Sequence, residues 1–303
     1  MNQNRYMDIK RLKPTFSDGF EKGDNIVVQE KIDGANFSIR YDESDNSIKA
    51  FSRKTKLDYN NNLRGAWEWS QKLDVELVKK VLGNNLILFM EWLVPHSVPY
   101  PNEIYHNAFC YDIYNTNTEE YLPQNMVEEK VNKLGLIYVP VFYKGDFISW
   151  KHIENFVGKT ELGGEYGEGV VVKNQTKLNN PNTRMPFYTK IVCERFCETK
   201  AYKISKPVDA NKLAKRERIL TLVESVVTVA RVQKILHKLV DENIIPEDWS
   251  AKDMKTIAQN LSHEVYYDCL KEEFNIVEEV GESFGKFASS TAMKIVRDIL
   301  NNK

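Results

Sequence analysis

The chain has 303 residues, of which 42% are hydrophobic and 28% are charged, and its formal net charge is −1. This length can bury a sizeable core and indicates two domains. The near-zero net charge does not by itself indicate a nucleic-acid binder. No apolar run approaches the ~20 residues that span a bilayer, and the first five residues carry no apolar signal region. We therefore expect a cytoplasmic chain with no membrane segment.

The four cysteines are scattered along the chain: Cys110, Cys193, Cys197 and Cys269. Cys193 and Cys197 have no second pair at a matching spacing. A reduced cytoplasmic chain explains this pattern better than a zinc site or a disulfide framework. Basic residues gather between Lys190 and Arg218, which indicates either a solvated helix face or a local surface for phosphates.

From about residue 24 to residue 192 the pattern is mostly that of β-strands. Short β-branched and aromatic runs, separated by polar turn clusters, recur at 26–28, 37–41, 48–51, 86–92, 108–114, 137–143, 170–172 and 187–192. Helical spacing over 67–82 predicts one helix, and a second is expected over 124–134, ended by Gly135.

After Pro207 the pattern becomes helical. Apolar residues repeat at three- and four-residue intervals over 213–240, and a further series runs over 276–299. Between them, Ser250 and Asp253 resemble a capping box for a helix that ends near Leu270. The sequence therefore predicts an α+β protein, with an antiparallel-sheet domain over residues 1–206 and a small all-helical domain over residues 207–303.

The segment Lys31-Ile32-Asp33-Gly34 lies between the first two predicted strands. A lysine at a strand end, followed by an acid and a glycine, is a usual way to present a nucleotidyl-accepting lysine. Lys31 must lose its proton to attack a phosphate, and nearby cations or a metal can lower its pKa enough. We expect Asp33 to hold a hydrated cation or to orient the amine, and Gly34 to let backbone and phosphate approach closely.

Three further motifs follow in order. Ser52-Arg53-Lys54 ends the third strand, and the Arg53 guanidinium could grip a phosphate or ribose. Glu91 interrupts the apolar run 86–92, where a buried carboxylate is costly unless it is paired or used. It suits a ribose hydroxyl or a metal-bound water. Phe109 and Tyr111 share one face of their strand, and either could stack on a purine.

The last two motifs place acid and lysine around short strands. Glu168 and Lys173 flank a run of three valines, and Lys190 lies on the strand that follows. The two lysines could neutralise a triphosphate and lower the pKa of Lys31. Each motif alone has an ordinary explanation, such as core packing or an exposed strand end. Six motifs in this order are far more specific than any one of them.

In this order the motifs resemble those of the covalent nucleotidyltransferase superfamily, which comprises ATP-dependent DNA and RNA ligases and mRNA capping enzymes. The resemblance covers about residues 28 to 198. Within the superfamily the chain most resembles the RNA ligase 2 class, because the signature from Lys31 continues through Asn36 and Phe37. The domain also begins almost at residue 1. A helical tail follows it, where DNA ligases and capping enzymes have a β-rich OB domain.

Two positions depart from the class pattern. Phage members carry histidine where this chain has Asp33, so Asp33 is closer to the DNA-ligase form. The final motif of the class has two lysines separated by one residue, and Val192 stands at the second place here. Lys190 then carries that role alone, or Lys200 compensates. The segment Phe196-Cys197-Glu198 does match the ending of the class.

The resemblance implies an ATP-dependent RNA ligase that seals 5′-phosphate and 3′-hydroxyl RNA ends through a lysyl-AMP intermediate, as in RNA repair. Lys31, Lys173 and Lys190 would be catalytic. The implied ATP site comprises Glu30, Lys31, Asn36, Arg53, Glu91, Phe109, Tyr111, Glu168, Lys173 and Lys190. Asp33, Glu91 and Glu168 would contact waters bound to Mg²⁺ or Mn²⁺. Glu30, or the backbone beside it, would read the adenine.

The expected partner is RNA with 5′-phosphate and 3′-hydroxyl ends, nicked or duplex, and the expected state is a monomer without membrane contact. Three alternatives remain open. The scaffold could belong to a DNA ligase or a capping-type enzyme, which a preference for nicked DNA or for GTP would reveal. A non-catalytic relative would bind RNA without adenylation. Chance matches in an unrelated metabolic enzyme are the third alternative.

Overall fold

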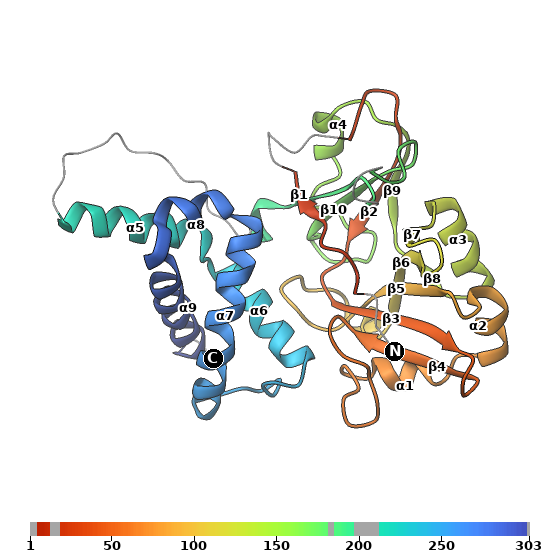
Figure 1. Cartoon of the computed structure of the whole chain (residues 1–303), viewed down its shortest axis with the longest axis horizontal. Coiled ribbons are helices and arrows are strands. Elements are labelled where there is room, and N and C mark those ends of the chain that lie inside the picture. The colour runs from red at the N-terminus through yellow and green to blue at the C-terminus, as the bar shows by residue number, and fades with distance from the viewer. Residues whose placement is uncertain (1–4, 13–18, 181–184, 197–211, 302–303) are drawn as a thin grey trace. The chain divides into compact units, whose positions relative to one another are not determined.

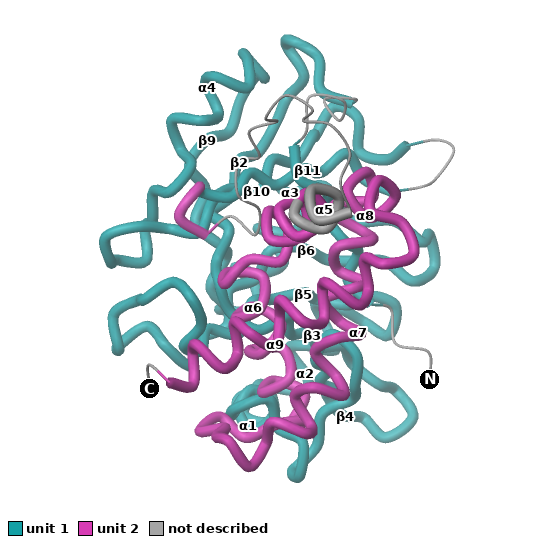
Figure 2. The backbone as a smooth tube through the Cα atoms, turned by 90° about the vertical axis from the view of Figure 1, so that its left-hand side faces the viewer, with its two compact units in different colours: residues 1–193 teal, residues 194–303 magenta. Residues whose placement is uncertain are grey.

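The structure is a computed structural model that describes residues 5–12, 19–180, 185–196 and 212–301. The chain forms two compact units, residues 1–193 and residues 194–303 (Figures 1 and 2). The predicted domain boundary after residue 206 falls between 197 and 211, outside the described residues, and stays a prediction. The α+β class, with sheets in the first unit and helices in the second, is confirmed.

The first unit contains a five-stranded sheet with the order β1-β11-β10-β2-β9. Its strands are β1 (Lys10–Arg11), β2 (Asn25–Lys31), β9 (Val141–Asp146), β10 (Gly169–Asn174) and β11 (Tyr188–Val192). All pairs are antiparallel except β1 with β11. The register places Lys31 opposite Gly169, which in turn lies opposite Val192. The nucleophile candidate therefore shares a row with the position where the class pattern has its second lysine.

A second sheet has the order β4-β3-β5-β6-β7, with β8 added in parallel to β6. Its strands are β3 (Ala35–Asp42), β4 (Ser47–Ser52), β5 (Leu86–Trp92), β6 (Ala108–Asn115), β7 (Glu120–Tyr121) and β8 (Ile137–Tyr138). In this sheet Asn36 lies opposite Glu91, and Glu91 lies opposite Phe109. Three predicted site residues thus form one row across three strands.

Each sheet buries one face in an apolar core. Alternate residues of the second sheet, such as Phe37 and Leu88, pack with residues of α1 (Ala66–Ser70), α2 (Val75–Leu82) and α3 (Gln124–Lys133). In the first sheet, Ile26, Val28, Val170 and Val172 pack with Ile153 of α4 (Trp150–Glu154) and with neighbouring residues. Because strand side chains alternate, Lys31 and Lys173 lie on the other face of the first sheet. The site is built on that face.

Two predicted elements are divided in the structure. The single helix expected over 67–82 is wrong, because Asp74 caps a new helix by accepting hydrogen bonds from the backbone N–H groups of Glu76 and Leu77. The strand expected over 137–143 is also divided, into β8 and β9, around Pro140, which has no N–H to donate. Helix α3 ends as expected, with Gly135 at φ +66°.

Among the described residues of the second unit, all regular elements are helices. This unit contains α5 (Lys212–Val226), α6 (Val229–Asp241), α7 (Met254–Glu272), α8 (Phe274–Val280) and α9 (Phe284–Asn301). The described parts of both units also contain short 3₁₀ helices, η1 (Asn102–Ile104), η2 (Glu194–Phe196), η3 (Ala251–Asp253) and η4 (Gly281–Ser283). Thr228 caps α6 and divides the apolar series 213–240 into two helices. The predicted capping box of Ser250 and Asp253 is confirmed.

Among the described residues, no helix is both long and apolar enough to cross a membrane. Cys110, Cys193 and Cys269 carry free thiols. Cys197 lies outside the described residues, as do Glu198, Lys200 and much of the basic segment between Lys190 and Arg218.

Candidate active site

The centre of the site is an ion pair between Lys31, the last residue of β2, and Glu168, the residue before β10. Their side chains are 24% and 14% exposed. The pairing of β10 with its neighbours needs a glycine at 169, because a Cβ there would lie 2.1 Å from the carbonyl oxygen of Ile191. The strand can therefore run close to both neighbours and deliver Glu168 to Lys31.

The pKa of Lys31 is raised in the structure. Burial disfavours its charge, but the ion pair with Glu168 outweighs burial, and the carboxylates of Asp33 and Glu91 act in the same direction. Neither Lys173 nor Lys190 is among the main causes of this shift, so the expectation that neighbouring lysines lower the pKa of Lys31 stays a prediction. Three predicted metal contacts, Asp33, Glu91 and Glu168, are thus close enough to act on Lys31.

Glu91 lies beside the nucleophile segment and accepts a hydrogen bond from the backbone N–H of Gly34 at 3.2 Å. Burial raises the pKa of Glu91 to about 8, although Lys31 and His96 oppose the shift. A Cβ on Gly34 would lie 2.6 Å from the carbonyl oxygen of Trp92. Gly34 is therefore required for the close packing of the motif on β5, whatever its role towards a phosphate.

Asp33 is bound to the loop that follows β5. Its Oδ2 accepts hydrogen bonds from the backbone N–H groups of Ser97 and Val98 at 2.8 and 2.9 Å, and its Oδ1 lies 3.6 Å from His96 Nδ1. Burial alone would raise its pKa, but these contacts and Lys31 lower it. Asp33 therefore organises the loop in the structure. Its contact with metal-bound water stays a prediction.

The carboxylates around Lys31 fit a cation held mainly by water and phosphate. In the described part of the chain, no group of three or more His, Cys, Asp or Glu side chains converges to hold a metal ion directly. Mg²⁺ usually keeps several waters and binds one or two carboxylates together with substrate phosphates. Glu91 and Glu168 are suitable for that arrangement, because each is only partly exposed and each acts electrostatically on Lys31.

Three other predicted ATP contacts are already engaged within the protein. Glu30 lies on the face of β2 that packs in the apolar core, opposite to the face of Lys31. Its carboxylate accepts hydrogen bonds from Thr160 Oγ1 at 2.6 Å and from the Glu161 N–H at 2.9 Å. Asn36 Nδ2 donates to the Tyr111 hydroxyl at 2.5 Å. Arg53 forms an ion pair with Asp8. Their roles towards ATP stay predictions.

A β-bulge in β6 brings two consecutive side chains to the site. Phe89 lies opposite Asp112 and Met90 lies opposite Cys110, so Tyr111 is an extra residue in the ladder. Cys110 and Met90 belong to the core with the helices. Phe89 and Tyr111 belong to the cluster on the opposite face. Tyr111 and Asp112 therefore both face the first sheet.

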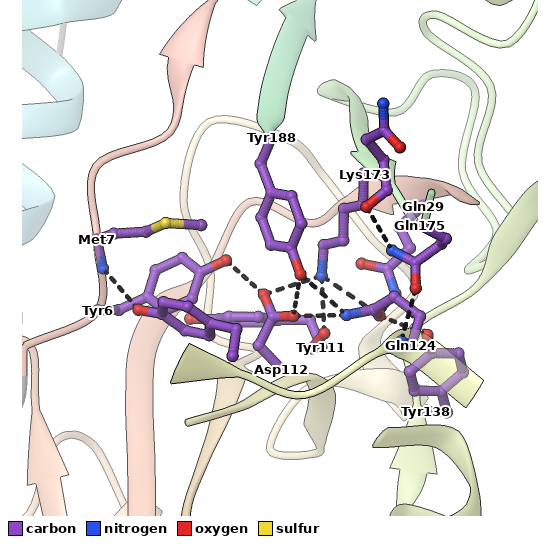
Figure 3. Close-up of polar contacts among 12 residues, drawn as sticks. Tyr6, Met7, Gln29, Tyr111, Asp112, Gln124, Tyr138, Lys173, Gln175 and Tyr188 are labelled. Carbon is purple, nitrogen blue, oxygen red and sulfur yellow. Dashed lines mark hydrogen bonds and ion pairs between the residues drawn. The ribbon is translucent and has the colours of Figure 1, made fainter. Parts of the chain in front are cut away.

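Asp112 meets Lys173 of the first sheet there (Figure 3). Lys173 Nζ donates to Asp112 Oδ2 at 2.9 Å and to the carbonyl oxygen of Tyr111 at 2.8 Å. Both side chains are buried, at 1% and 0% exposed. Desolvation lowers the pKa of Lys173, and Asp112 opposes that shift. The charge of Lys173 is thus compensated by Asp112 inside the protein. Lys190, in contrast, lies half-buried on β11.

Sequence reasoning missed several residues of this arrangement. Asp112 interrupts an apolar strand as Glu91 does, so the same cost of a buried carboxylate could have identified it. Gln124, Tyr188 and Tyr6, which contact Asp112, carry no local signal because they come from distant parts of the chain.

Comparison with known protein families gives one match. The sequence model of the RNA ligase family matches residues 24–192, more than half of the chain. The chain therefore belongs to the RNA ligase family. The matched region contains all the predicted site residues. No match was found among curated protein sequences.

Solved structures of RNA ligases are similar to this chain at low sequence identity. An archaeal ATP-dependent RNA ligase (form 1) covers 99% of this chain and 67% of its own, with a TM-score of 0.51 and 16% identity. A Naegleria gruberi RNA ligase with PPi covers 64% of this chain and 57% of its own, with a TM-score of 0.47 and 18% identity. The chain thus spans little more than half the length of the Naegleria protein.

Proposed function

We propose that the chain is an ATP-dependent RNA ligase that transfers AMP from ATP to Lys31 and then to the 5′-phosphate of an RNA strand. The observation that carries the proposal is Lys31 at the end of β2, ion-paired with Glu168 and surrounded by Asp33 and Glu91. Membership of the RNA ligase family supports the same conclusion. We place the chain in the RNA ligase 2 class on its signature through Asn36 and its helical second unit.

In the first step, the neutral Lys31 amine attacks the α-phosphorus of ATP. A P–N bond forms, the bond to the β-phosphate oxygen breaks, and pyrophosphate leaves. The Lys31 ammonium must first leave its ion pair with Glu168 and lose one proton to solvent. The attacking nitrogen loses a second proton to solvent as the P–N bond forms. A bound Mg²⁺ or Mn²⁺ would neutralise phosphate charge and lower the pKa of the amine.

In the later steps, the 5′-phosphate oxygen of RNA takes the AMP from Lys31, and a 3′-hydroxyl attacks that activated phosphate and releases AMP. Lys190 and Arg53 are suitable for phosphate contacts, because both are only partly buried. Lys173, which is held by Asp112, would act by fixing the bulge of β6 rather than by touching phosphate. Tyr111 and Phe109 remain the candidates for stacking on adenine.

The proposal is tested by incubating the protein with Mg²⁺ and ATP labelled at the α-phosphate, followed by denaturation. Label should remain on the wild type and be lost from Lys31→Ala, because only Lys31 provides the amine. Lys133→Ala is the matched control, since Lys133 is exposed and pairs with Glu129 on the surface of α3. An unlabelled wild type, or equal labelling of Lys31→Ala, would refute the proposal.

Labelling, sealing and RNA-binding assays together separate the alternatives. Labelling by GTP in preference to ATP would favour a capping-type enzyme. Sealing of nicked DNA above nicked RNA would favour a DNA ligase, which is the form that Asp33 resembles. RNA binding without any label would indicate a non-catalytic relative. We further propose a cytoplasmic monomer that acts on nicked or duplex RNA in repair. Comparing the sealing of nicked, duplex and single-stranded RNA would test the substrate preference.

A further inference from the structure

The segment of residues 5–12 precedes the region that the RNA ligase family model matches. It nevertheless lies against the predicted nucleotide site. The ring of Tyr6 packs against Phe89, Tyr111 and Tyr121, with centroid separations of 5.1, 4.9 and 5.7 Å. Tyr6 therefore touches the same ring, Tyr111, that is a candidate for stacking on adenine.

The Tyr6 hydroxyl adds a polar contact to this packing. It donates to Asp112 Oδ2 at 2.5 Å. Burial, together with the charge of Asp112, raises the pKa of Tyr6 well above its usual value, so the hydroxyl keeps its proton and acts as a donor. A hydrogen bond to a charged acceptor is stronger than one between neutral groups. Tyr6 is thus fixed at both its ring and its hydroxyl.

Asp112 accepts hydrogen bonds from four side chains among the described residues (Figure 3). Tyr6 and Lys173 donate to Oδ2, and Gln124 and Tyr188 donate to Oδ1, at distances from 2.5 to 3.3 Å. Lys173 also donates to the Tyr111 carbonyl oxygen. The bulge is therefore held from two sides. The N-terminal segment packs against the Tyr111 ring, and Lys173 of β10 binds the Tyr111 backbone carbonyl.

The same segment reaches two other predicted site residues. Asp8 pairs with Arg53, and the backbone N–H of Leu12 donates to the carbonyl oxygen of Lys190 at 3.0 Å. Strand β1 also pairs with β11 in the register of Arg11 with Lys190. One segment of eight described residues thus contacts parts of three motifs that are far apart in the sequence.

We propose that Tyr6 is a positioning residue for the nucleotide, which holds the Tyr111 ring and the bulge of β6 in place for adenine binding. This inference rests on the proposed function. Tyr6 does not touch the reacting atoms. The Tyr111 ring, as a surface on which adenine stacks, would stabilise bound ATP and the transition state equally. Its displacement therefore raises KM for ATP and leaves kcat nearly unchanged.

The test uses the full chain with Tyr6→Phe and Tyr6→Ala. It measures the maximal rate constant of labelling, taken as kcat, and the ATP concentration that gives half of this rate, taken as KM. Tyr6→Phe should raise KM about tenfold, which converts to about 1.4 kcal/mol, and Tyr6→Ala should raise it further. Tyr59→Phe is the matched control, because Tyr59 is 76% exposed in the same unit. It should leave KM, kcat and the melting temperature unchanged.

A second measurement tests whether Tyr6 acts through Tyr111. In a Tyr111→Ala background, the further change to Tyr6→Phe should have little effect on KM, because the ring that it positions is gone. The inference is overturned if Tyr6→Ala leaves KM unchanged, if only its melting temperature falls, or if the KM effect persists without Tyr111. An unlabelled wild type would instead defeat the proposed function itself, and this inference with it.

Discussion

At the scale of single residues, the fold raises the pKa of the Glu91 carboxyl group far above its usual range. Its pKa of about 8 results from burial, which Lys31 and His96 only partly offset. The protonated form is therefore favoured in the folded state. Between the unfolded pKa, near 4.5, and the folded pKa, the native state binds more protons than the unfolded chain, so the stability falls as pH rises.

We predict that Glu91→Gln gains stability relative to the wild type as pH increases. The difference in free energy of unfolding should grow by about 2 kcal/mol between about pH 6 and pH 9, because glutamine does not ionise. Urea denaturation at several pH values measures it. Glu129→Gln is the control, since the pairing of Glu129 with Lys133 lowers its pKa. Parallel pH profiles for wild type and Glu91→Gln would contradict the prediction.

Residue patterns predicted much of the site and missed part of it for identifiable reasons. The order of motifs placed Lys31, Glu91, Tyr111 and Glu168 on strands or strand ends, where the structure has them. Period-two alternation could also have placed Glu30 on the face opposite Lys31. Tyr6 and Asp112, which are hydrogen-bonded, are 106 residues apart in the sequence. No local period encodes such a contact.

At the scale of elements, Arg231 connects helices α6 and α7 through a buried charge. Its side chain is fully buried, with Nε donating to Asp268 Oδ2 at 2.8 Å and Nη1 donating to the Val226 carbonyl oxygen at 2.5 Å. Glu272 and Glu273 lie 3.7 Å from Nη2. A buried ion pair of this kind adds little stability compared with apolar residues of similar volume. Removing only one partner is destabilising, because it leaves the other charge buried and uncompensated.

Arg231→Ala should therefore destabilise the second unit by about 3–5 kcal/mol. Fluorescence during denaturation reports on it through Trp249, a buried residue and the sole tryptophan of residues 194–303. Arg218→Ala provides the comparison, because Arg218 pairs with Glu279 on the surface and should cost less than about 1 kcal/mol. Equal losses for the two variants would show that the buried contacts are not energetically special.

The breaks within elements show where pattern reading has a physical limit. Apolar spacing predicted helix correctly on both sides of Thr228 and of Asp74, but it continued across both residues. Side-chain oxygens there satisfy the first N–H groups of a new helix. An apolar period records which residues are buried, and it is insensitive to such a local restart.

At the scale of the whole molecule, the two units have separate apolar cores. All predicted site residues lie in the first unit. We predict that a fragment of residues 1–206 still forms the labelled adduct with ATP, because it retains Lys31 and its surrounding acids. The same fragment should lose most sealing of nicked RNA, if the helical unit holds the strand with the 3′-hydroxyl.

Parallel labelling and sealing assays on the fragment and the full chain check this division. The fragment with Lys31→Ala is the control for adduct formation. A folded fragment that takes up no label would contradict the assignment of adenylation to the first unit. Full sealing by the fragment would remove the proposed role of the helical unit.

The bulge of β6 has a consequence for how much chemistry one strand can carry. A regular strand offers each face one side chain per two residues, or about 6.6 Å of length. The extra residue lets β6 present the Tyr111 ring and the Asp112 carboxylate from adjacent positions on one face. Functional groups are thereby twice as dense at this point. In a regular strand, the Tyr111 ring and the Asp112 carboxylate could not share a face from adjacent positions. They would have to be two residues apart, and the site would be longer.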